Sequence, residues 1–173
     1  MTACGSGTGP PRVDAFGLPI GQPLTRAELA AHGESHLYYP GSKVVRLVGS
    51  NQIANPQEPK EPNPAYAGAI LTATATADQL YAFYGQQLRA RGFYTEPNYH
   101  LASQVSGRTW EVDQRVQVQV GIFDPVLLEQ DQNIATAPGP GELVYEVILV
   151  GYTKHPVDDS PQTASTENPA EPH

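Results

Sequence analysis

Residues 76–92 place the strongest constraint on what this chain can fold into. Their apolar side chains recur at intervals of three and four, which puts them on one face of an α-helix: Leu80, Phe83, Tyr84 and Leu88. Thr76 and Gln79 have capping-box spacing at the start, and Gly92 is typical of the left-handed residue after a last turn. The pattern predicts one long amphipathic helix, which must bury its apolar stripe against another element.

Downstream of this helix the apolar period changes from 3.6 residues to two, as in β-strands. Residues 108–113 and 115–123 alternate, with a tight connection near Asp113 and Gln114, so they predict a hairpin. Residues 142–152 are apolar on both faces over part of their length, which favours a central strand.

The first half of the chain adds weaker elements. Residues 43–49 and 67–76 are rich in β-branched or alternating residues and predict two more strands. Thr25 and Glu28 have capping-box spacing and predict a short helix over 26–32. We expect loops over 56–64 and 124–141. The order β-β-α-β-β-β predicts an α+β fold: a two-layer sandwich with one long helix packed on a mainly antiparallel sheet of about five strands.

The chain holds 17 prolines and 16 glycines in 173 residues, and many of them lie near its ends. Residues 1–24 are rich in glycine, proline and small polar residues and predict a flexible tether. Residues 25–153 would form a single domain. The polar, proline-rich residues 154–173 predict a disordered tail.

The charge of the chain excludes one class of partner. Its formal net charge is −8 and it has no run of lysine and arginine, so we expect no nucleic-acid partner. No run of 18 or more apolar residues is present, so the sequence predicts no spanning helix.

The only cysteine is at position 4, after Met1, Thr2 and Ala3 and before Gly5. This stretch resembles the lipobox of bacterial lipoproteins, although Met1 stands where a branched apolar residue is usual. The resemblance implies an acylated Cys4, a signal peptide truncated upstream, a membrane anchor, and an extracytoplasmic place in the cell envelope. The order of elements is also similar to that of small envelope lipoprotein domains of unknown function. The alternative is that Cys4 is an ordinary free thiol.

Few residues point to chemistry. His32 and His36 lie four apart, but Gly33 follows the predicted helix, so we interpret this stretch as a surface turn and expect no metal or cofactor. Two carboxylates could meet across a sheet face as an acid/base pair, although solvation at strand edges is the simpler interpretation. The candidates are Glu111, Asp113, Asp124, Glu142 and Glu146.

Nine tyrosines remain, and those outside the predicted core suggest a contact surface: Tyr38, Tyr39, Tyr66 and Tyr99. The main hypothesis is a lipid-anchored envelope domain with a non-catalytic binding or interaction role toward a protein or glycan. One alternative is an envelope hydrolase that acts on cell-wall or sugar substrates through paired carboxylates. The other is a structural spacer.

Overall fold

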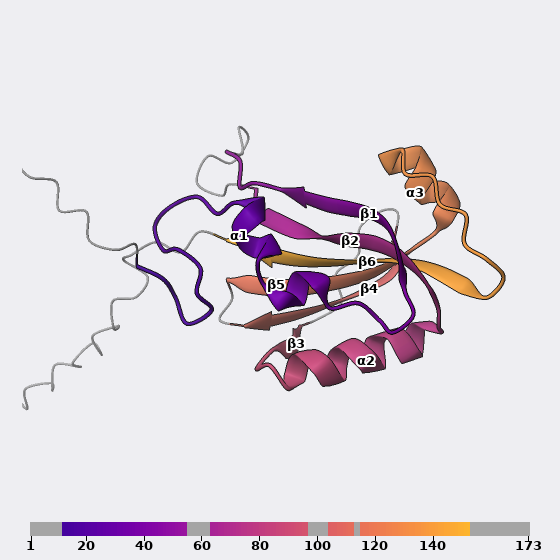
Figure 1. Ribbon diagram of the computed structural model, residues 1–173, viewed down its shortest axis with the longest axis horizontal. Helices are drawn as coiled ribbons and strands as arrows, with labels where there is room; N and C mark the ends of the chain where they lie inside the picture. Colours follow the sequence, from indigo (N-terminus) through magenta and orange to yellow (C-terminus); the bar gives the residue numbers. More distant parts are fainter. Residues whose placement is uncertain (1–11, 55–62, 97–103, 113–114, 153–173) are drawn as a thin grey trace, which may run out of the picture.

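The computed structural model describes residues 12–54, 63–96, 104–112 and 115–152 (Figure 1). These residues form an α+β fold built around an antiparallel sheet, as the sequence predicts. The strands are β1 (Lys43–Ser50), β2 (Ala65–Thr74), β3 (Tyr94–Glu96), β4 (Gln104–Val112), β5 (Val116–Phe123) and β6 (Glu142–Gly151). The helices are α1 (Arg26–Ala30), the 3₁₀ helix η1 (Gly33–His36), α2 (Ala77–Arg89) and α3 (Pro125–Gln132).

The strands lie in the order β1-β2-β6-β5-β4-β3. Every neighbouring pair is antiparallel. The central position predicted for the last strand is confirmed, because β6 pairs with β2 on one side and β5 on the other. The pairing of β4 with β5 is also confirmed, whereas the predicted connection at Asp113 and Gln114 lies outside the described residues.

Helix α2 begins and ends where the sequence predicts. Thr76 and Gln79 form the capping box, and Gly92 has a φ of 87° just after the last turn. Leu80, Tyr84 and Leu88 are fully buried. The Tyr84 ring lies 6.2 Å from that of Trp110 on β4, so the predicted stripe contacts the sheet.

The folded unit begins earlier than we expected. Leu18 and Leu24 are almost fully buried in the same apolar cluster as the α2 stripe, and Val13 forms a β-bridge with Pro19. The boundary expected at Thr25 therefore lies too late, since residues 12–24 pack against the domain. Their apolar residues are interrupted by glycine and proline and do not form a sustained helical or strand period.

A buried ion pair fastens this N-terminal segment to the start of β5. Arg115 donates hydrogen bonds to the Asp14 carboxylate and to the carbonyl oxygens of Pro19 and Tyr152. The side chains of Arg115 and Asp14 are each only 3% exposed. The second carboxylate oxygen of Asp14 accepts from the backbone N–H groups of Phe16 and Leu18 at 3.0 and 2.8 Å. Both buried charges are thus hydrogen-bonded, as their burial requires.

The expected loop over 124–141 contains helix α3. The Asp124 side chain accepts from the N–H groups of Val126 and Leu127, Pro125 occupies the first turn, and Asn133 ends the helix in a left-handed conformation. These are ordinary start and stop signals that the weak apolar period concealed.

Leu128 of α3 and the following Ile134 pack against one end of the second sheet face. Their partners Ile70, Phe123 and Val144 alternate along their strands with residues of the main cluster. The sheet therefore carries apolar packing on both faces, with the smaller cluster under α3.

The short helix near residue 26 is confirmed, with its predicted capping box between Thr25 and Glu28. It ends at Ala30, not at residue 32 as expected, and η1 follows it directly.

Candidate functional site

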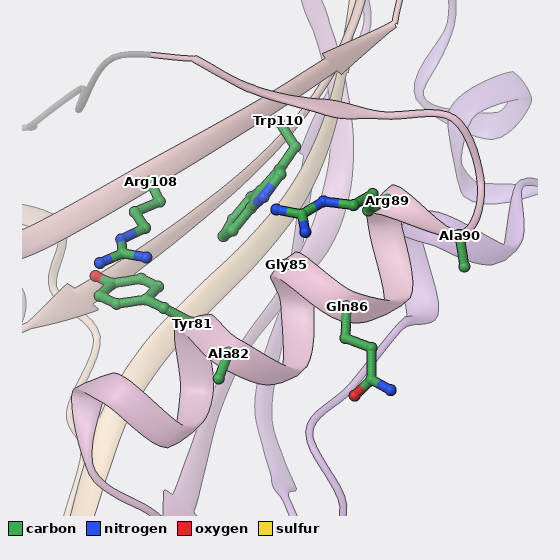
Figure 2. Close-up of a pocket in the computed structure, with 8 residues that line it drawn as sticks. All are labelled: Tyr81, Ala82, Gly85, Gln86, Arg89, Ala90, Arg108 and Trp110. Carbon is green, nitrogen blue, oxygen red and sulfur yellow. The ribbon is translucent and has the colours of Figure 1, made fainter.

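A shallow groove of about 570 Å³ lies between α2 and β4 (Figure 2). It is lined by Tyr81, Ala82, Gly85, Gln86, Arg89, Ala90, Arg108 and Trp110. Its lining residues come from α2, from Ala90 just after it, and from β4. On the helix side Ala82 and Gly85 are small, and a Cβ atom added at Gly85 would meet open space.

One wall of the groove carries Arg108, which is held against Tyr81. The guanidinium carbon lies 4.6 Å from the centre of the Tyr81 ring, a cation–π arrangement. The Tyr81 hydroxyl is hydrogen-bonded to Ser106 Oγ at 2.8 Å, which fixes the ring. Burial raises the pKa of Tyr81, an effect opposed by the hydrogen bond with Ser106 and the charge of Arg108. The ring therefore stays neutral and supports the cation at physiological pH.

The other cation is Arg89, in the last turn of α2. Its side chain is exposed, and Figure 2 shows its guanidinium group pointing toward Trp110. Within the described part of the chain neither Arg89 nor Arg108 has a carboxylate partner. Other basic side chains do, since Arg91 pairs with Glu34, Lys43 with Glu142, and Arg115 with Asp14.

The groove thus offers two guanidinium groups, in a chain of net charge −8. Guanidinium is a planar donor that suits carboxylate and phosphate oxygens. Trp110 is only 2% exposed and Tyr81 only 5%, so their ring faces are largely covered. The geometry favours recognition of an anionic group over the stacking of a neutral ring.

The three described tyrosines of the predicted contact surface do not all lie on one face of the sheet. Tyr38 and Tyr39 are half-buried, and the Tyr39 ring packs edge-on against Phe83 at 5.4 Å. Tyr66 is on β2, where it alternates with the core residues Ala65 and Ala67 and so faces the opposite side of the sheet. Tyr99 lies outside the described residues.

His32 and His36 have different contact partners. The His32 ring stacks on Phe16 at 4.4 Å, whereas His36 is hydrogen-bonded to the Ala30 carbonyl oxygen and to the Tyr38 hydroxyl. The described residues contain no group of histidine, cysteine, aspartate and glutamate side chains that could hold a metal ion.

Glu111 and Glu146 are buried on the face of the sheet opposite α2. The Glu111 carboxylate accepts from the Tyr94 hydroxyl at 2.6 Å and from Gln117 Nε2 at 3.2 Å. Glu146 is 8% exposed, and burial raises its pKa to about 7. Glu111 is paired with Gln117 on β5, which is paired with Val150 on β6. Val150 is four residues from Glu146 on the same strand. By strand geometry, the Cα atoms of Glu111 and Glu146 therefore lie about 16 Å apart.

The other candidate acids have local structural roles. Asp124 caps α3. Glu142 accepts from Lys43 Nζ and from the Gly139 N–H, each at 2.8 Å. The hydrogen bond from Lys43, with that of Gly139, holds the pKa of Glu142 below its usual value. Asp113 lies outside the described residues.

Comparison with known proteins adds no relative. No family model, no curated protein and no solved structure matches the chain. The interpretation of the groove therefore rests on its own geometry.

The sequence did not single out the groove. Arg89 lies off the apolar stripe of α2, and Arg108 and Trp110 are two apart on a strand, which predicts only a shared face. The position of α2 along β4 brings these residues together, and no spacing in the sequence predicts that position. A basic residue two positions from the only tryptophan is the one signal available.

Proposed function

We propose that this protein is a lipid-anchored domain of the cell envelope with a non-catalytic binding role toward a protein or glycan partner. The groove between α2 and β4 would bind an anionic group of that partner. The observation that carries the proposal is the pair of guanidinium groups of Arg89 and Arg108 beside one groove, neither of which has a carboxylate partner among the described residues. Because Arg108 is already held on the Tyr81 ring, little side-chain entropy is lost when it binds an anion.

The anchor is the second part of the proposal. The lipobox-like residues before Cys4 support acylation of its thiol, and two or more acyl chains hold a protein stably at a membrane. No helix in the described residues is long and apolar enough to cross a membrane.

The proposal includes the predicted two-layer sandwich. Its layers would be the sheet and α2, the one long helix, which packs on one face of that sheet. Leu80 and Leu88 belong to the same buried cluster as Val118 and Val147, which supports this arrangement. Such a rigid scaffold would hold Arg89 of the helix at a constant distance from Arg108 of the sheet.

The alternative of a hydrolase with paired carboxylates has less support. Glycoside hydrolases place their two carboxyl groups roughly 5 to 9.5 Å apart. The sheet register puts Glu111 and Glu146 further apart, and Glu111 already accepts two hydrogen bonds. The raised pKa of Glu146 follows from burial.

A binding experiment tests the groove. Polygalacturonate, a glycerol-phosphate polymer and polyglutamate would be titrated by calorimetry, with dextran as the neutral comparison. We expect one or more of the polyanions to bind, and Arg108→Gln and Arg89→Gln each to weaken binding by about tenfold. Increasing salt should weaken it further.

The matched control is Arg91→Gln, which removes an exposed arginine two residues from Arg89 that is paired with Glu34. It should leave affinity within about twofold, because its charge is already partnered. Equal losses of affinity in all three variants would show that the polyanions are attracted to positive charge in general and not to the groove. No binding of any polymer would favour the structural spacer.

The anchor has a separate test. After expression of the natural reading frame in a bacterial host, mass spectrometry of the membrane fraction should find Cys4 as an acylated N-terminal residue. Cys4→Ser should lose the acyl chains and leave the membrane fraction. An unmodified Cys4 in that fraction would contradict the proposal while leaving the groove untouched.

A further inference from the structure

Strand β1 forms an exposed edge of the sheet. It pairs with β2 on one side, and it is the last strand in the order, so among the described residues no strand pairs with its other side. It lies at one border of the sheet in Figure 1. Five of its eight residues are exposed, whereas β2 beside it is buried along most of its length.

The exposed side chains of β1 differ between its two faces. Val44 and Leu47 are 48% and 57% exposed, and they are paired with Leu71 and Ala69 on the α2 side of the sheet. Lys43 and Arg46 are paired with Thr72 and Ile70, which belong to the opposite face. The edge is therefore apolar on one face and basic on the other.

Soluble proteins usually protect such an edge with bulges and charges. Here Val45 forms a bulge between Val44 and Arg46, which leaves Arg46–Ser50 in regular register with β2. Lys43 is already paired with Glu142. Arg46 has no carboxylate partner among the described residues, and no acidic residue occurs in residues 43–50.

A second copy of this chain would fit the edge poorly. Antiparallel pairing of two β1 strands centred on Arg46 would place the two Arg46 side chains directly opposite each other on one face. This contact between like charges opposes self-pairing in that register.

We propose that the β1 edge binds an extended segment of a partner protein by strand addition. That segment would alternate apolar residues, placed beside Val44 and Leu47, with acidic residues placed beside Arg46. Backbone hydrogen bonds would supply much of the affinity, and the two faces of β1 would select the alternating pattern.

The test uses the whole domain and a soluble nine-residue peptide that alternates glutamate with valine. We expect the peptide to bind in fluorescence polarisation and to shift the backbone amide resonances of β1. A peptide with alternate N-methylated backbone amides should lose binding, because its backbone can no longer pair. A peptide with lysine for glutamate should bind at least about tenfold more weakly.

Substitutions in β1 complete the test. Arg46→Glu should weaken binding of the acidic peptide by about tenfold or more, and should favour the lysine peptide instead. Leu47→Asp should weaken binding similarly. Val105→Asp, which changes an even more exposed apolar residue on β4, should not. Melting temperatures near that of the natural chain would show that the variants are folded.

Three results would overturn the proposal. The first is no binding of the acidic peptide. The second is binding that survives N-methylation or the β1 substitutions. The third is a dimer in sedimentation equilibrium that Leu47→Asp dissociates, since a second copy would then cover this edge.

Discussion

Replacing Arg115 by methionine should lower the free energy of unfolding by about 3 to 5 kcal/mol. Methionine keeps much of the length and apolar volume of the arginine stem, so the loss would come mainly from the charge. The substitution leaves the Asp14 carboxylate buried without its cation, and leaves the carbonyl oxygens of Pro19 and Tyr152 without their donor. A buried group without a partner costs far more than the pair contributes when intact.

Urea denaturation followed by tryptophan fluorescence would measure this loss, because Trp110 is buried in the core. The control is Arg91→Met, which removes an exposed ion pair with Glu34 and should cost less than about 1 kcal/mol. Adding Asp14→Leu to Arg115→Met should recover part of the stability by removing the unpaired charge. A similar loss in the two single variants would mean that Arg115 does not fasten the N-terminal segment.

Replacing Glu146 by glutamine should stabilise the protein at pH 8 by about 2 to 3 kcal/mol and have little effect near pH 4.5. Glu146 is buried on β6 between Ile70 and Gly121, and this burial raises its pKa from 4.5 to about 7. The charged carboxylate is therefore disfavoured in the folded state.

The direction of the pH dependence follows from proton binding. Between pH 4.5 and about 7 the folded state keeps the Glu146 proton while the unfolded state releases it. Raising the pH in this range therefore favours unfolding, and the contribution of Glu146 is lost as pH rises through its folded pKa. Glutamine stays neutral at every pH, so its variant should lack this decline.

Urea unfolding at pH 4.5, 6, 7 and 8 would measure the effect as the difference between the natural chain and Glu146→Gln. The control is Glu129→Gln, an exposed glutamate of α3. If the stability gained by Glu146→Gln is the same at every pH, Glu146 does not titrate in this range. If that gain decreases as the pH rises, the pKa of Glu146 is not raised in the folded state.

Much of the fold was predictable because periodicity and caps are local properties. Thr76, Gln79 and Gly92 fixed the limits of α2, and the alternation of valine with glutamine fixed the faces of β5. The apolar run of β6 correctly predicted its central place. By contrast, the packing of Leu18 and Leu24 depends on contacts with distant strands, and no local pattern carries that information.

The groove was less predictable for a related reason. The stripe on α2 predicts which helix face is buried, but not where the helix lies along β4. That position places Arg89 and Arg108 beside the same groove. The half-burial of Tyr38 and Tyr39 against the main core cluster likewise depends on contacts with distant residues, and their role in a contact surface stays a prediction.

The attachment of Asp14 to Arg115 changes how an anchored form of this protein would be held. Ten peptide steps separate Cys4 from Asp14, which is held against the domain by Arg115, and these steps can reach at most about 36 Å. A domain on so short a tether would stay within roughly its own diameter of the bilayer surface. It would therefore encounter molecules that lie in the headgroup layer far more often than molecules diffusing through the wider compartment.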